Sequence, residues 1–174
     1  MEIKYNLNIN DYTDFNIHYV ENNASIQKKF KTQKIAGSIL LLAVAILLYF
    51  NLPLTNFFAK LVIPAIFVTL AFVWYLSFDK LVHNRTISQT KKTIRKLDEV
   101  LLVEPINLIF KDQQITIQQK HEDTYQYVDV DRLYITDKHL FFYLKENAII
   151  IPKDKLDTKQ ISFIEKTFAK KLIS

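Results

Sequence analysis

Two long uncharged stretches dominate the hydropathy pattern of the chain. Residues 35–52 carry no charge, and as a helix they would extend about 27 Å. Residues 57–78 contain a single charge, Lys60, near their start. Each stretch can cross the hydrocarbon core of a bilayer, so the pattern predicts a transmembrane hairpin with a short connector at 53–56. A soluble protein of this size would have to bury both stretches on nearly every side, which argues against that class. A cleaved signal peptide is also not expected, because the mostly polar residues 1–34 precede the first stretch.

Basic residues precede the first apolar stretch and follow the second, whereas the connector between them carries no charge. The positive-inside rule therefore places both termini in the cytoplasm, with two spans in the bacterial inner (plasma) membrane. The same residues are candidate contacts for anionic lipid at the membrane surface, although fixing the topology is a sufficient role for them. They are Lys28, Lys29, Lys31, Lys34, Lys80, Arg85, Lys91, Lys92, Arg95 and Lys96.

The segments on either side of the hairpin show helical periodicity after a short N-terminal strand. Apolar residues at 3, 5, 7 and 9 alternate with polar ones, which predicts a strand with one buried face. Asn10 or Asp11 is expected to cap a following amphipathic helix that runs on through Lys34 into the membrane. A basic helix is expected over 79–104, and the two helices would pack as an antiparallel stalk in which Phe30 meets Ile87.

From Pro105 the period changes to two, which predicts a meander of short strands. Turns are expected at Asp112-Gln113 and at 121–123, and Pro152 ends the sheet. Asp157 with Gln160 forms a capping-box pattern for a last helix. The strands are expected over 106–110, 115–117, 125–127, 133–135, 140–144 and 148–151. The buried face of the last helix would carry Ile161, Ile164, Phe168 and Leu172.

Composition narrows the possible chemistry. The single glycine, Gly37, excludes the P-loop, the dinucleotide fingerprint and the nucleophile elbow, and the absence of cysteine excludes disulfides and thiolate sites. The four histidines form no HExxH pattern. Asp129 and Asp131 point to one side of a strand but lack the spacing of a calcium loop. We therefore expect no catalytic residue, no metal and no cofactor.

The net charge of +5 does not indicate a nucleic-acid-binding protein. Residues 79–174 carry 17 basic and 14 acidic residues. That balance is unsuited to a groove that follows a phosphate backbone, so no nucleic-acid partner is expected.

The C-terminal part of the chain resembles the bacterial YcxB-like proteins. The resemblance rests on INLIFKDQQITIQQKHEDTYQYVDVDRLYITDKHLFFYLKENAIIIPKDKLDTKQISFIEKTFAKKL, most specifically on the strand ending in IIIPKD before the last helix. It implies a pleckstrin-homology-like antiparallel sheet capped by a C-terminal helix. Tyr127 stands where many relatives carry tryptophan. Lys120 is followed by His121 and Glu122, so an acid occupies the place of the last arginine in a phosphoinositide motif, and specific inositol-phosphate recognition is not expected.

Pattern and resemblance together predict an α+β membrane protein with four parts. These are an N-terminal strand and helix (1–34), the hairpin (35–78, with spans 35–52 and 57–78), a basic helix (79–104) and a pleckstrin-homology-like domain (105–174). The expected function is non-catalytic docking of a protein partner, of unknown identity, at the membrane, with residues such as Phe142 or Ile150 in the docking patch. Lipid binding or sensing and toxin immunity are the alternative functions, and a second copy of the chain, in a homo-oligomer, is an alternative partner.

Overall fold

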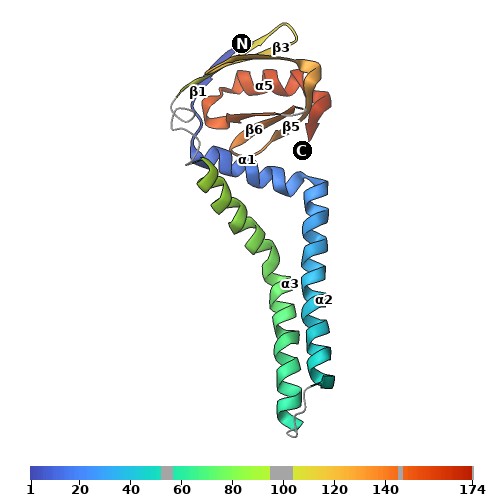
Figure 1. Cartoon of the computed structure of the whole chain (residues 1–174). Coiled ribbons are helices and arrows are strands. Elements are labelled where there is room, and N and C mark those ends of the chain that lie inside the picture. The colour runs from blue at the N-terminus through green and yellow to red at the C-terminus, as the bar shows by residue number, and fades with distance from the viewer. Residues whose placement is uncertain (52–56, 95–103, 145–146, 174) are drawn as a thin grey trace. The chain divides into compact units, whose positions relative to one another are not determined.

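The computed structural model describes residues 1–51, 57–94, 104–144 and 147–173 (Figure 1). The chain divides into two compact units, whose boundaries fall inside helices α1 (Ile9–Asn22) and α3 (Phe57–Ile94). We call Met1–Asn16 with Gln89–Ser174 the β unit, and Ile17–Ser88 the helical unit. The β unit is therefore assembled from both ends of the sequence.

The first sheet of the β unit is antiparallel, with strand order β1-β2-β3-β4. Its strands are β1 (Glu2–Tyr5), β2 (Ile106–Lys111), β3 (Gln114–Gln118) and β4 (Glu122–Gln126). β1 pairs with β2 from Glu2 opposite Ile109 to Tyr5 opposite Ile106. In the sequence, the whole helical unit lies between these two strands. The alternation of apolar residues correctly predicted β1, because Ile3 and Tyr5 are buried while their neighbours are exposed.

The second sheet has strand order β7-β6-β5-β8. Its strands are β5 (Val130–Ile135), β6 (His139–Leu144), β7 (Ala148–Pro152) and β8 (Leu172–Ile173). The first three are antiparallel, and β8 lies parallel to β5. Three short 3-10 turns complete the unit: η1 (Tyr127–Asp129), η2 (Lys153–Lys155) and η3 (Ala169–Lys171).

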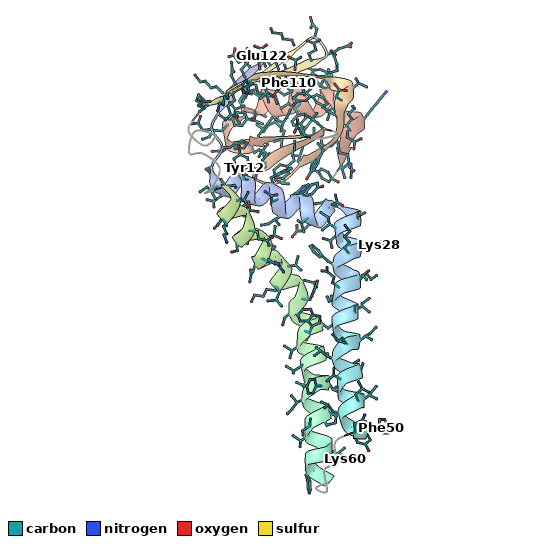
Figure 2. The ribbon with its side chains drawn as sticks, in the orientation of Figure 1. Tyr12, Lys28, Phe50, Lys60, Phe110 and Glu122 are labelled. Atoms are coloured by element: carbon teal, nitrogen blue, oxygen red, sulfur yellow. The ribbon has the colours of Figure 1, made fainter. Side chains whose placement is uncertain are left out.

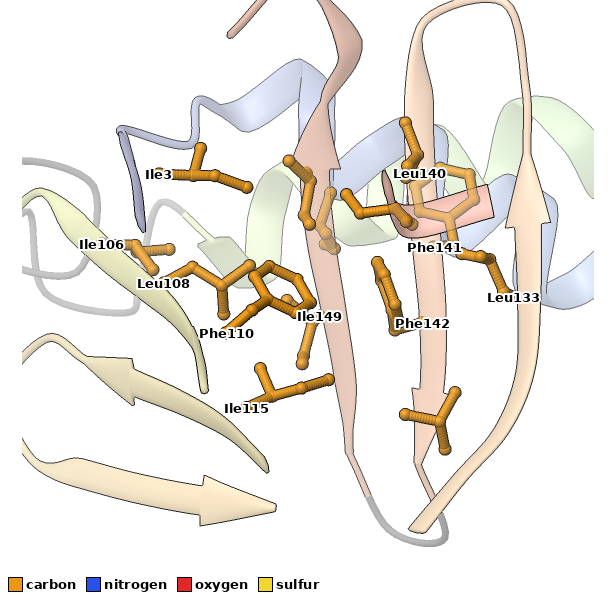
Figure 3. Close-up of a cluster of buried hydrophobic side chains, with 14 of the residues drawn as sticks. Ile3, Ile106, Leu108, Phe110, Ile115, Leu133, Leu140, Phe141, Phe142 and Ile149 are labelled. Carbon is orange, nitrogen blue, oxygen red and sulfur yellow. The ribbon is translucent and has the colours of Figure 1, made fainter. Parts of the chain in front are cut away.

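One hydrophobic core joins the two sheets to helix α5 (Thr158–Thr167) (Figure 3). Phe142 lies at its centre, with ring centroids 6.2 Å from Phe110 and 5.2 Å from Phe168. Burying a side chain of this size contributes about 1.5–3 kcal/mol relative to leaving it exposed. The largest fully buried side chains are Phe141, Phe142, Leu108, Ile115, Leu133, Leu140, Ile151, Ile164 and Val130.

The predicted capping box of the last helix is confirmed. The Asp157 carboxylate accepts a hydrogen bond from the Gln160 N–H at 2.7 Å, and the Gln160 amide oxygen accepts one from the Asp157 N–H at 2.9 Å. The helix ends at Thr167, so the expectation that Leu172 continues its buried face is wrong. Leu172 lies in β8 and is 39% exposed.

Another correction concerns the end of β4. The strand ends at Gln126, and Tyr127 lies in η1 instead of continuing the strand. The Asp129 carboxylate accepts a hydrogen bond from the Gln126 N–H at 2.9 Å. This local bond holds the 3-10 turn and ends the extended backbone at that point.

The helix following β1 differs from the predicted one at both ends. Its cap is Asn8, whose side-chain oxygen accepts hydrogen bonds from the N–H groups of Asn10 and Asp11 at 2.7 and 3.2 Å. Nor does one helix run through to Lys34, because α1 ends at Asn22 and α2 (Ala24–Asn51) starts separately. The Asn23 side chain caps α2 by accepting from two backbone N–H groups at 3.1 Å.

Helices α2 and α3 are both long and apolar enough to cross a membrane, with mean hydropathies of 1.9 and 2.2. Only 6% and 11% of their apolar windows are buried within the protein. Figure 2 shows Lys28 towards the start of α2, with Phe50 and Lys60 at the far end of the hairpin. These helices, the antiparallel sheets and the C-terminal helix confirm the predicted α+β class. The connector, residues 53–56, lies outside the described residues.

The predicted stalk register is wrong. The Phe30 ring lies 6.5 Å from the Phe78 ring, centroid to centroid, whereas Ile87 is nine residues further along α3, or about 13 Å by helical rise. Leu97 and Leu101 of the expected stripe lie outside the described residues. Beyond the Phe30–Phe78 contact, α2 and α3 enclose a cavity together with the end of α1.

Candidate membrane-surface site

The basic residues before the first apolar stretch lie on the initial turns of α2. Lys28, Lys29 and Lys31 are exposed. One helical turn separates Lys28 from Lys31, so these two side chains share a face of the helix. This part of α2 therefore presents positive charge directly beside the apolar segment.

Lys34 differs from the other lysines of α2 because its ammonium group is already engaged. It forms an ion pair with Asp79 at 2.7 Å and lies 4.4 Å from the centroid of the Tyr75 ring. The Lys34 side chain is 18% exposed. A partly exposed pair of this kind contributes about 1 kcal/mol or less. Lys34 thus joins α2 to α3.

The remaining predicted basic residues do not form one site with these. Lys80 and Arg85 are exposed on the helical unit's part of α3. Lys91 and Lys92 also lie on α3 but belong to the β unit. Arg95 and Lys96 lie outside the described residues. The structure therefore pairs Lys34 with Asp79, and the eight described residues of the predicted ten are distributed over both units.

An aromatic contact beside the Lys34–Asp79 pair was not predicted from the sequence. Trp74 and Phe78 pack with ring centroids 5.5 Å apart, and the Trp74 indole covers Gly37 of α2. A Cβ atom at Gly37 would lie 2.5 Å from the indole Nε1, so only glycine allows this approach. The lone glycine within an apolar helix was the available signal.

A cavity of about 160 Å³ lies between the end of α1, the start of α2 and α3. Its lining combines apolar side chains with the carboxylates of Glu21 and Asp79. Glu21 lies 3.8 Å from the His83 ring nitrogen Nδ1. On the neighbouring turn of α1, burial lowers the pKa of His18, and the Glu21 charge opposes that shift. The lining residues are Ile17, Val20, Glu21, Gln27, Phe30, Asp79, Val82, His83 and Thr86.

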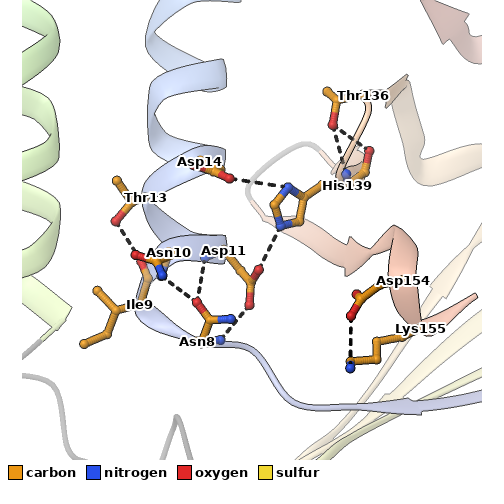
Figure 4. A network of polar contacts seen from close by, with 10 residues as sticks. All are labelled: Asn8, Ile9, Asn10, Asp11, Thr13, Asp14, Thr136, His139, Asp154 and Lys155. Carbon is orange, nitrogen blue, oxygen red and sulfur yellow. Dashed lines mark hydrogen bonds and ion pairs between the residues drawn. The ribbon is translucent and has the colours of Figure 1, made fainter.

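The β unit contains a buried polar contact that sequence reasoning missed (Figure 4). The His139 Nε2 lies 2.8 Å from a carboxylate oxygen of Asp11, and both side chains are at least nine-tenths buried. Its Nδ1 lies 3.8 Å from the Asp14 carboxylate. Because Asp11 also accepts a hydrogen bond from the Asn8 N–H at 2.7 Å, one carboxylate joins the helix cap to β6.

Two tyrosines beside this contact show the effect of burial. Burial raises the pKa of Tyr5, and the neighbouring Tyr12 raises it further. Burial and then the Asp11 charge raise the pKa of Tyr12. Both phenols are thereby held neutral in the folded chain.

A polar cleft of about 380 Å³ lies beside the Asp11–His139 contact. It carries lysines and aspartates in equal number, and Lys155 pairs with Asp154 at 3.1 Å. Such balanced charge selects neither an anion nor a cation. Asn6, Asn8, Asp11, Asp137, Lys138, Pro152, Lys153, Asp154 and Lys155 line it.

Lys171 occupies an unusual position in η3. Its ammonium group donates hydrogen bonds to the carbonyl oxygens of Tyr127 and Val128, each at 2.9 Å, and to that of Val130. These bonds join the C-terminal segment to the turn before β5. The ammonium thereby satisfies carbonyls that the 3-10 turn leaves free.

The described part of the chain holds no group of three or more His, Cys, Asp or Glu side chains placed to bind a metal ion. The Asp129 carboxylate accepts the hydrogen bond from the Gln126 N–H at the start of η1. Asp131 pairs with its neighbour Arg132 at 3.5 Å. The two aspartates considered from the sequence therefore have structural partners.

Comparison with known proteins matches one segment of the chain. Neither the curated proteins nor the solved structures gave a match. The matched segment runs from the last residues of β2 to the end of α5, and so covers most of both sheets. Residues 110–168 match the family model described as YcxB-like protein, which confirms the resemblance of this chain to the YcxB-like family.

Proposed function

We propose that this chain is a non-catalytic protein of the bacterial plasma membrane whose β unit docks a protein partner at the cytoplasmic surface. The observation that carries the proposal is the position of the apolar hairpin between β1 and β2. A folded β unit is thereby attached to two membrane-length helices through both ends of the hairpin.

The membrane location is supported by the surface of α2 and α3. Leu40 is 66% exposed and Leu76 is 62% exposed, and Phe50 and Phe58 are each 75% exposed. Apolar surface on this scale is unfavourable in water and favourable in lipid. The basic residues beside it favour the cytoplasmic side for both flanks.

The pairing of β1 with β2 supports a location of both ends of the hairpin on one side of the membrane. Two strands of one sheet must lie on the same side of the membrane, and two spans return the chain to the side from which it started. Cysteine substitution tests this directly, because the chain has no cysteine. Lys4→Cys with Asn107→Cys, which are opposed in the sheet, should form a disulfide in membranes.

Lys4→Cys with Lys111→Cys is the matched control. Lys111 lies four residues beyond the partner of Lys4, or about 13 Å along the strand, which exceeds the reach of a disulfide. Loss of maleimide labelling after mild oxidation reports the bond. Equal labelling of both oxidised pairs would contradict the proposed topology.

The pleckstrin-homology-like assignment is supported by the strand arrangement. Strands β1–β4 form one sheet, β5–β7 form most of the other, and α5 packs against the common core. In this arrangement the hairpin is an insertion between the first two strands. We propose that the insertion places a partner-binding domain directly at the membrane.

The docking surface cannot include Phe142 or Ile150, which are 0% and 5% exposed, so that expectation was wrong. Both side chains belong to the hydrophobic core, Phe142 from the central strand β6 and Ile150 from the edge strand β7. Among the described residues of the β unit, the exposed large apolar side chains are Val128 at 77%, Phe163 at 41%, Leu172 at 39% and Ile173 at 37%. Val128 is the best candidate contact because most of its surface is free of the core.

The experiment is native mass spectrometry of the full-length protein, purified gently from its host membrane with a C-terminal tag. A stoichiometric second protein should be retained by the wild type and by Lys120→Asp, an exposed control on the β3–β4 turn. It should be lost from Val128→Asp at an unchanged thermal midpoint. Equal recovery with Val128→Asp and Phe163→Asp would contradict docking at this surface.

Anionic lipid binding is the second candidate, and the exposure of Lys28, Lys29 and Lys31 favours it. Each lysine near an anionic leaflet contributes about 1 kcal/mol before screening by salt. Replacing all three by glutamine should abolish the enrichment of phosphatidylglycerol around the protein in mixed nanodiscs. Enrichment that survives both this change and high salt would exclude these lysines as the lipid contact.

A further inference from the structure

The cavity of the helical unit lies at the boundary between the apolar and polar parts of both helices. Lys34 is the last charged residue before the first apolar stretch, and Asp79 is the first after the second. Their ion pair therefore marks the same level on α2 and α3. Asp79 lines the cavity, and the other lining residues of α2 and α3 lie on its polar side. In a membrane this level is that of the lipid headgroups.

The charge of the lining selects a cation. Glu21 and Asp79 contribute carboxylates that are 59% and 76% exposed, and among the described residues no lysine or arginine lines the cavity. Lys34 lies outside the lining and pairs with one oxygen of Asp79, which leaves the Glu21 carboxylate and the other Asp79 oxygen for a ligand. The apolar part of the lining includes the aromatic ring of Phe30, a surface suited to a partly desolvated ammonium group. A phosphate would be repelled here, whereas an amine would be attracted.

Two lysines are adjacent in sequence to lining residues without lining the cavity themselves. Lys80 directly follows Asp79, and Lys31 precedes Lys34 by about one helical turn. Both are exposed. A ligand with its amine in the cavity could therefore place a linked phosphate beside these lysines, which is the charge pattern of a zwitterionic lipid headgroup.

We infer that this cavity binds the headgroup of phosphatidylethanolamine, an inference that rests on the proposed membrane location. The primary ammonium carries three hydrogen-bond donors, which suit the Glu21 carboxylate and the Asp79 oxygen that Lys34 does not engage. The choline group of phosphatidylcholine carries none, and phosphatidylglycerol has no positive charge. The cavity thus selects a different lipid class from the exposed lysines of α2.

The test uses full-length protein in nanodiscs of equimolar phosphatidylethanolamine, phosphatidylcholine and phosphatidylglycerol, with retained lipid identified by native mass spectrometry. Phosphatidylethanolamine should be retained about fivefold more than phosphatidylcholine, as expected for one exposed ion pair. Glu21→Gln combined with Asp79→Asn should remove this preference. Val82→Trp, which fills the cavity, should remove it as well.

Lys34→Met is the matched control, because it breaks the Lys34–Asp79 pair but leaves the carboxylate in place. It should keep the lipid preference, which a merely structural role of the pair would not allow. Trp74 fluorescence and the thermal midpoint identify any variant that fails to fold. Equal retention of the three lipids, preference for phosphatidylglycerol, or equally tight binding of soluble phosphoethanolamine would overturn the inference. A chain that does not enter nanodiscs would instead contradict the membrane proposal itself.

Discussion

The contact between Gly37 and Trp74 makes a sharp prediction for Gly37→Ala. In the present geometry the added methyl carbon would lie 2.5, 2.8 and 3.2 Å from three atoms of the indole. Ordinary contacts between carbon atoms are about 3.5–4.0 Å, so either the indole or the helix must move. Trp74 is 36% exposed, which leaves room for part of that movement.

The expected net effect is a destabilisation of the hairpin by about 1–2 kcal/mol. Overpacking a well-packed contact costs about 1–3 kcal/mol, and alanine returns up to about 1 kcal/mol through its higher helix propensity. Gly37→Leu, with a larger side chain, should cost more. Gly37→Ala with Trp74→Phe should be less destabilised than the sum of the two single variants, because the smaller ring removes the clash.

The assay is intrinsic fluorescence during thermal unfolding in nanodiscs. Trp74 is the only tryptophan of the chain, so in Gly37→Ala and Gly37→Leu its emission reports on this contact. The variants that carry Trp74→Phe contain no tryptophan, so the additivity comparison uses thermal unfolding followed by circular dichroism. A lowered midpoint and a shifted emission maximum are expected for Gly37→Ala. An unchanged maximum with an equal or higher midpoint, together with tolerance of Gly37→Leu, would refute the reasoning.

Three further predictions concern the stability of the β unit, followed by circular dichroism of the full chain in detergent. Asp11→Ala should cost about 3 kcal/mol of unfolding free energy, because it leaves the buried Nε2 of His139 without its carboxylate partner. Asp11→Asn should cost less, and equal costs would contradict the pairing. Lys171→Met should lower stability by about 1–3 kcal/mol through three lost hydrogen bonds, whereas exposed Lys170→Met should not. Burial raises the pKa of Tyr5 above 10.0 in the folded chain. The contribution of Tyr5 to the free energy of unfolding is therefore complete below pH 10.0 and is lost as the pH rises above that value. Tyr5→Phe should therefore reduce alkaline destabilisation between neutral pH and about pH 11, and identical pH profiles would rule this out.

The sequence by itself determined the elements whose signal is local. The apolar stretches appear as α2 and α3, the alternation at Ile3 and Tyr5 as β1, and the Asp157–Gln160 pattern as a capping box. Each depends on residues within a few positions of one another, where periodicity and capping chemistry act. The helix break at Asn23 also has a local signal, because asparagine is a strong helix cap. The apolar periodicity continues across Asn23, so the sequence pattern predicted one helix instead of two.

Only the tertiary structure decided what depends on contacts distant in sequence. Helical periodicity predicts the helix face on which Phe30 lies but not the residue it contacts. Only the structure shows that Phe30 packs against Phe78 and not Ile87. The burial of Phe142 and the contact of Asp11 with His139 likewise require that segments from both ends of the chain assemble into one unit. Hydrophobic pattern specifies which side of an element is apolar, whereas the neighbour covering that side is chosen by the packing of the whole core.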